Sequence, residues 1–200
     1  MTRSGVLVSV AICGVVAGCG GSPSAPSGVP VFAEGKISMT FTPQNQRFAN
    51  ATEEYRRVWA ADGSRIVDAM EQGTGLTFLE THVNAVIFDG VSSSGGGSTP
   101  MYLRASHPAD LKKAVLVHEY GHRLIAQLRI RPADLPEHHV LDLFLYDVWE
   151  SLWGRDLADR EVRFERELGA QYEAAWTWAL SLTRAERVSR FADIVRANRQ

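Results

Sequence analysis

Apolar and polar residues are patterned differently before and after Pro108. Residues from Lys36 to Thr42 alternate one by one, which is the period of a half-buried strand. The segment from Val83 to Phe88 is apolar enough for a strand in the middle of a sheet. The segment from Met101 to Arg104 follows a proline and fits a short edge strand. The first half of the chain therefore predicts a small sheet.

Apolar residues recur at helical spacing between the first two strands and again after the third. The first helix carries Asn50 and Glu53 in the spacing of a capping box, and Asp62-Gly63 is expected to bend or split it. Further helices are expected over residues 108–129, 139–153 and 157–182, and from residue 184 onward. Strands followed by helices indicate an α+β fold.

The first nineteen residues have the layout of a secretory signal. Arg3 precedes a short apolar run from Val6 to Val16, which is shorter than a membrane-spanning helix requires. The end of this run, Val16-Ala17-Gly18-Cys19, resembles the lipobox of bacterial lipoproteins, in which the cysteine is lipidated and begins the mature chain. A plain signal peptide with an incidental cysteine is the alternative.

The lipoprotein resemblance implies three regions and a location. Residues 1–18 would be a signal peptide, and residues 19–31, rich in Gly, Ser and Pro, a flexible linker anchored to the membrane through lipid on Cys19. Residues 32–200 would form one domain, outside the cytoplasm in the bacterial cell envelope.

Composition and charge narrow the range of partners. The 200 residues are 45% hydrophobic, which is enough for one core, and carry a formal net charge of −2. Basic residues form no block, so we expect no nucleic-acid partner. The paired Arg and Glu residues of segment 160–167 are typical of a solvated helical face.

Residues 118 to 122 read His-Glu-Tyr-Gly-His and carry the strongest chemical signal in the chain. Positions four apart lie on one face of a helix, so His118 and His122 can reach one metal ion, and Glu119 lies beside that face, where a carboxylate can take a proton from water. Chance gives about 0.01 occurrences of this pattern in a chain of this composition. Gly121, between the two histidines, suggests close packing beneath the metal.

The segment from Val117 to His122 resembles the active-site helix of the zincin metallopeptidases. The resemblance implies Zn²⁺, a zincin-like sheet, and an edge strand, here Met101 to Arg104, that binds extended peptide substrate. Metzincins have a glycine and a third histidine where this chain has Ile125 and Leu128, and peptide deformylases use a cysteine ligand, which is absent after Cys19. The gluzincin pattern remains, in which an acidic third ligand comes from a later helix.

Three carboxylates are candidates for that third ligand. Trp149-Glu150-Ser151-Leu152 resembles the gluzincin segment in which the ligand is followed by a small residue, which favours Glu150. Asp147 is the alternative, since it lies in an apolar stretch where a carboxylate needs a partner. Glu173 on the next helix is a third candidate. A carboxylate that does not bind metal could instead orient one of the histidines.

Four further residues could contribute to the site. His138 and His139 could line it or cap the helix that follows, although an exposed pair at a loop edge is the simpler interpretation. Tyr146 and Tyr172 could donate a hydrogen bond to an oxyanion, although core tyrosines are the simpler interpretation here too.

Together these features predict a zinc-dependent peptidase that hydrolyses peptide bonds through metal-activated water, with Glu119 as general base. The alternative is a non-catalytic envelope lipoprotein that uses the same helix as a structural metal site or binding module.

Overall fold

The computed structural model describes residues 36–129, 132 and 135–199. The expected signal peptide, the lipid-bearing Cys19 and the linker lie outside the described residues. Within the described ranges, no helix combines the length and the apolarity needed to cross a membrane.

The three expected strands form one parallel sheet in the order β1-β2-β3. The strands are β1 (Ser38–Pro43), β2 (His82–Phe88) and β3 (Met101–Arg104). Strand β2 is central, as its apolar composition predicted, and β3 lies at an edge. Alternate residues of each strand face one buried side, which confirms the period-two pattern; these are Met39, Phe41, Val83, Ala85, Ile87, Met101 and Leu103.

Helix α1 (Ala49–Thr74) connects β1 to β2 and runs unbroken through Asp62-Gly63. The absence of a side chain at Gly63 accommodates the Trp59 ring, because a Cβ atom there would lie 2.8 Å from it. The expected capping box at Asn50 does not form. Asn45 instead caps a short 3-10 helix, η1 (Gln46–Phe48), that leads into α1.

Five helices follow the sheet: α2 (Ala109–Ile125), α3 (Glu137–Trp153), α4 (Arg155–Arg166), α5 (Ala170–Ser181) and α6 (Arg184–Ala197). The helix expected over residues 157–182 is two helices, because the chain turns at Gly169, whose φ of 154° is unfavourable for other residues. The last helix begins where expected, with a capping box between Thr183 and Glu186.

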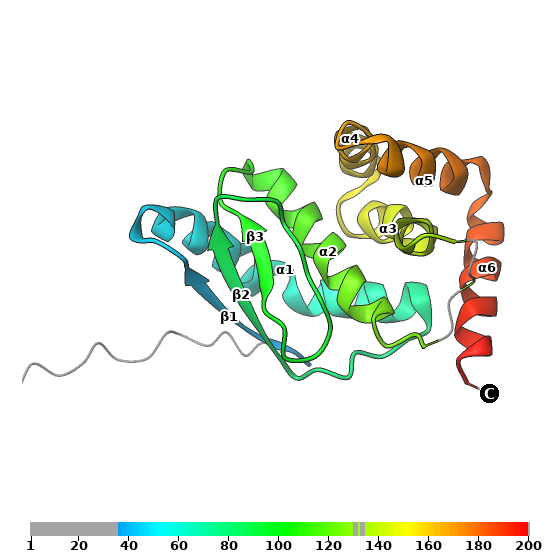
Figure 1. Cartoon of the computed structure of the whole chain (residues 1–200), viewed down its shortest axis with the longest axis horizontal. Coiled ribbons are helices and arrows are strands. Elements are labelled where there is room, and N and C mark those ends of the chain that lie inside the picture. Colours follow the sequence, from blue (N-terminus) through cyan, green and yellow to red (C-terminus); the bar gives the residue numbers. More distant parts are fainter. Residues whose placement is uncertain (1–35, 130–131, 133–134, 200) are drawn as a thin grey trace, which may run out of the picture.

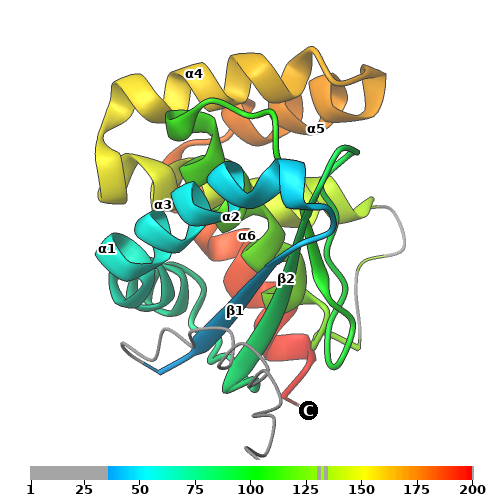
Figure 2. The ribbon, with the colours of Figure 1, turned by 90° about the vertical axis from the view of Figure 1, so that its left-hand side faces the viewer.

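Helices α1 and α2 pack against the sheet, and α3 packs against every other helix of the fold. Figure 2 shows α4 and α5 running together across the top of the molecule, above α1, α2 and the sheet. The fold is thus mixed α+β and mostly helical, with a small parallel sheet. The packing of α2 between the sheet and α3, with α4 and α5 above, positions the site described next.

Candidate metal centre

Helix α2 brings the side chains of His118 and His122 together. Their Nε2 atoms are 3.0 Å apart, as expected for residues four apart on one helix. Gly121 lies against α3, and a Cβ atom there would be 2.5 Å from Leu141 Cδ1. The expectation that this glycine permits close packing is confirmed, and the packing brings α3 against the histidine-bearing helix.

His138, in the first turn of α3, is the third member of the cluster. One ring nitrogen from each of His118, His122 and His138 lies within 4.8 Å of the other two, so the group could hold a metal ion. The Nε2 atom of His138 is buried and has no hydrogen-bond partner among the described residues. A buried nitrogen without a partner is costly unless something binds it, which fits a metal ligand.

Two carboxylates orient the histidines of α2. Glu165 Oε1 lies 2.7 Å from His118 Nδ1, and Glu137 Oε1 lies 2.7 Å from His122 Nδ1. Carboxylates accept rather than donate, so each Nδ1 carries the proton and each Nε2 presents a lone pair. Two lone pairs that face each other across 3.0 Å repel unless a cation lies between them. The hydrogen bonds therefore favour a metal ion or a proton at this point.

The pKa values of the three histidines also favour a single positive charge in the cluster. Burial opposes the charge of His118, but the Glu165 carboxylate outweighs it and raises the pKa of this imidazole to about 9. Burial and the charges of His118 and His122 lower the pKa of His138 to about 4. Burial also lowers the pKa of His122. The cluster thus holds one cation and leaves its other imidazoles neutral, which is the form that binds metal.

Glu119 follows His118 on α2 and is 4% exposed. Its Oε2 atom is buried without a hydrogen-bond partner among the described residues. Burial raises the pKa of the Glu119 carboxyl to about 7, with the positive charge of His118 opposing the rise and Glu165 adding to it. A carboxyl with this pKa can both accept and release a proton near neutral pH.

A cavity of about 160 Å³ opens beside Glu119 and His118. It lies between the carboxyl end of β3, the helix α2 and the connection from α4 to α5. Its walls are mainly apolar, and its lining includes Val115, Phe164, Leu168 and Tyr172. The candidate base and one of the histidines therefore face a space that a small group can enter.

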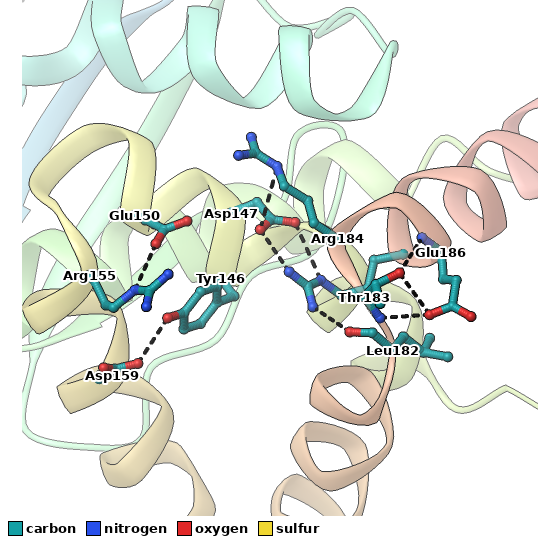
Figure 3. Close-up of polar contacts among 10 residues, drawn as sticks. Tyr146, Asp147, Glu150, Arg155, Asp159, Leu182, Thr183, Arg184 and Glu186 are labelled. Carbon is teal, nitrogen blue, oxygen red and sulfur yellow. Dashed lines mark hydrogen bonds and ion pairs between the residues drawn. The ribbon is translucent and has the colours of Figure 1, made fainter.

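The carboxylates expected as third ligand bind arginines instead (Figure 3). Glu150 Oε1 lies 3.2 Å from Arg155 Nε. Asp147 Oδ1 lies 2.7 Å from Arg187 Nη2, and Arg184 approaches the same oxygen at 3.8 Å. His138, which the sequence offered only as a residue that could line the site, lies beside His118 and His122.

The remaining expected residues divide between the site and the surface. Tyr146 donates a hydrogen bond to Asp159 at 2.9 Å and does not line the cavity, whereas Tyr172 lines it and lies against His138, with ring centroids 4.3 Å apart. Glu173, the third candidate ligand, is an exposed residue of α5 whose carboxylate lies 3.6 Å from Arg166.

The outer edge of β3 is covered by the chain that leads to it. Ser93 and Tyr102 exchange two backbone hydrogen bonds, of 3.0 and 2.8 Å, and Ser92 Oγ accepts from the Arg104 backbone N–H at 3.0 Å. Arg123 holds this segment to α2, because its guanidinium donates to the backbone oxygens of Gly95, Gly97 and Thr99. An extended peptide could pair with this edge only by displacing the segment.

Sequence reasoning missed Glu165 and Glu137 as partners of the histidines. Glu165 belongs to the segment expected to be a solvated face, yet Glu161 and Glu165 are 4% and 5% exposed. The apolar residues Leu157, Ala158 and Val162 at helical spacing mark this buried face and could have indicated it.

Comparisons with family models, with curated proteins and with solved structures found no match.

Proposed function

We propose that the chain is a zinc-dependent peptidase in which His118, His122 and His138 bind the metal and Glu119 is the general base. The observation that carries the proposal is the unpartnered Glu119 carboxylate beside three converging imidazoles at the wall of a cavity. Three protein ligands with a free fourth position are the composition of catalytic zinc sites, whereas structural sites have four protein ligands.

The donor set favours zinc over other common ions. Three neutral imidazoles suit zinc, whereas calcium and magnesium prefer oxygen ligands. Two nitrogen ligands of a tetrahedral zinc ion lie about 3.3 Å apart, close to the 3.0 Å between the facing nitrogens of His118 and His122. Glu165 and Glu137 supply the outer hydrogen bonds that keep the ligands in place.

Zinc, when bound, supplies a Lewis acid that makes water more acidic and polarises a carbonyl group. Glu119 takes a proton from the attacking water and passes it to the leaving amine, and its buried Oε2 atom has no hydrogen-bond partner among the described residues that would compete for this role. Tyr172 lines the same cavity, and burial together with the negative charge of Glu165 raises the pKa of its hydroxyl, so it keeps its proton and can stabilise an oxyanion. Of the two tyrosines that the sequence offered for this role, the proposal takes Tyr172, because Tyr146 does not line the cavity.

The choice of a peptide bond rests on the resemblance of residues 117–122 to the zincin helix. An apolar cavity beside the base is consistent with it, because such a space takes a substrate side chain. The same measurements test the zincin assignment and the peptide substrate.

Metal content and cleavage of a mixed peptide library test the proposal. The chain should bind one zinc ion and cleave peptides. Glu119→Gln should keep the zinc and lose about 10²- to 10⁴-fold in rate. Glu173→Gln, which changes an exposed carboxylate of α5, should keep both properties. One bound zinc with no cleavage would favour the non-catalytic alternative, and no stoichiometric zinc would overturn the metal site.

We also propose that the enzyme works outside the cytoplasm of a bacterium, held to the envelope by lipid on Cys19, as the lipobox resemblance implies. Expression of the full chain in a bacterium with labelled fatty acid should label the protein, and Cys19→Ser should abolish the label. An unlabelled wild-type chain would contradict the anchor.

A further inference from the structure

The cavity beside Glu119 has room for one apolar side chain. Its volume is about 160 Å³, and a cavity of about 150 Å³ holds one benzene molecule. Its apolar walls come from both sides of the site, with Val91 on the segment before β3, Val115 on α2, Phe164 near the end of α4, and Leu168 in the turn that follows α4. The size and the lining fit one branched aliphatic or aromatic residue.

Arg104, the last residue of β3, adds a positive charge to this apolar lining. Its Nε atom donates to the Gly90 carbonyl at 2.8 Å, which holds the side chain in place. No carboxylate of the described residues lies within ion-pair distance of it. Arg123 and Arg187, by contrast, each bind a carboxylate, those of Glu80 and Asp147.

A fixed cation without a carboxylate partner in a partly enclosed space favours an anionic ligand, because the surrounding apolar groups screen charge poorly. The neighbouring His107 does not offer an anionic ligand a second positive charge near pH 7. Burial and the charges of Arg104 and Lys112 lower the pKa of this imidazole to about 4, so it is neutral near pH 7. Among the described residues that line the cavity, Arg104 is therefore the only cation at neutral pH apart from a protonated or metal-bound histidine cluster.

The covered edge of β3 limits how a peptide can reach the site. The hydrogen bonds of Ser92 and Ser93 to this strand occupy the backbone groups that an extended substrate would use. A chain that continued along β3 past the cavity would have to displace this segment. A chain that ends inside the cavity would not.

We propose that the cavity receives the C-terminal residue of a peptide, with an apolar side chain in the pocket and its α-carboxylate bound by Arg104. The inference rests on the proposed function and makes the enzyme a carboxypeptidase. Water adds to the carbonyl carbon of the last peptide bond, and the C–N bond breaks. The water proton moves through Glu119 to the leaving nitrogen, so the products are a shortened peptide with a new carboxylate and a free apolar amino acid.

The test compares an acetylated tripeptide that ends in leucine with its C-terminal amide. Calorimetry on the zinc-loaded Glu119→Gln protein measures binding without turnover, and the wild-type enzyme measures kcat/KM. The free acid should bind at least about tenfold more tightly, since a charge-assisted hydrogen bond contributes about 1.5–3 kcal/mol. Adding Arg104→Gln should bring the two affinities together, and Arg104→Lys should keep part of the preference. Arg163→Gln, an exposed arginine of α4, is the control and should change neither affinity.

Failure of this inference and failure of the proposed function give different results. Equal binding and equal cleavage of acid and amide, with cleavage inside longer peptides, would overturn the carboxylate site and leave the peptidase standing. Preferential binding of the acid that depends on Arg104, without any cleavage by the wild type, would overturn the peptidase and support the carboxylate site. The comparison of acid and amide on the unchanged chain stays decisive if an Arg104 variant does not fold.

Discussion

Glu165 and His118 are joined by a 2.7 Å contact between Oε1 and Nδ1, although 47 positions separate them in the chain. The other oxygen of Glu165 accepts a hydrogen bond from Trp176 Nε1 at 2.8 Å. The contact ties α4 and α5, which form the layer above the site, to the orientation of one imidazole on α2. Both oxygens of this buried carboxylate therefore have hydrogen-bond partners, one on α2 and one on α5.

Removing the charge of Glu165 should weaken metal binding without removing a ligand. Glu165→Gln keeps the shape of the side chain but loses the negative charge that favours the imidazole orientation. We expect zinc affinity to fall about 10- to 100-fold, measured by competition with a chromogenic chelator. Glu167→Gln, which changes the exposed residue directly after the same helix, is the control. Equal affinities for the two variants would contradict a positioning role for Glu165.

The adjacent histidines of α3 should behave differently. His138→Ala should lower zinc affinity by more than about 100-fold, because a ligand contributes more than the outer partners that cost about 10- to 100-fold. His139→Ala should leave it unchanged, since that ring lies against Trp178. Zinc titration of both variants, with Glu150→Gln beside them, decides the third ligand. Loss of zinc in Glu150→Gln with retention in His138→Ala would reject the present assignment.

Gly121→Ala should disturb both stability and the metal site. Alanine gains about 1 kcal/mol in helix propensity, but its Cβ would lie 2.5 Å from the buried Leu141 Cδ1, and overpacking costs about 1–3 kcal/mol. We expect a net loss of about 1 kcal/mol in unfolding free energy and weaker zinc binding, because α3 carries His138. Gly73→Ala is the matched control in α1. Its Cβ would meet Val148 at an ordinary 3.5 Å, so urea unfolding should show a gain of up to about 1 kcal/mol.

Asp147 should contribute to stability rather than to metal binding. It pairs with Arg187, and the two side chains are 11% and 6% exposed. Asp147→Asn leaves a buried guanidinium without its counter-charge, which should cost about 3 kcal/mol. Glu150→Gln breaks the more exposed pair with Arg155 and should cost much less than this, because water screens an exposed ion pair. Urea unfolding of the zinc-free proteins checks both values, and a loss of zinc with unchanged stability in Asp147→Asn would contradict this role.

The protonation of His107 should make the zinc-free chain less stable in mild acid. An imidazole in water has a pKa of 6.5, and burial with the charges of Arg104 and Lys112 lowers the pKa of His107 to about 4 in the fold. Between these values the unfolded chain binds more protons, so the free energy of unfolding falls as the pH decreases from about 6.5 to about 4. Above this window the group contributes no pH dependence. His107→Gln should show a shallower fall in urea unfolding across the same range, and an unchanged slope would contradict the depressed pKa.

Local regularities of the chain were enough to predict much of the fold. The position of β1 followed from the alternation of its residues, because successive side chains of a strand point to opposite faces. The position of β2 followed from its continuous apolar character, which is typical of a strand in the middle of a sheet. The facing nitrogens of His118 and His122 followed from one helical turn. The division between α4 and α5 could not be predicted from the sequence. A single glycine such as Gly169 within a helical pattern can either be tolerated by the helix or end it.

His118, Glu119 and His122 could be placed together from the sequence because about 3.6 residues per turn fix their relative positions, whatever surrounds the helix. His138, Glu137 and Glu165 reach them only through the packing of α3 and α4 against α2, where the close approach at Gly121 sets which turn of α3 faces the site. The sequence offered Glu150 through its resemblance to the gluzincin segment and Asp147 through its apolar surroundings. Helical periodicity carries no information on the crossing of two helices, and that crossing brings His138, rather than Asp147 or Glu150, beside His118 and His122.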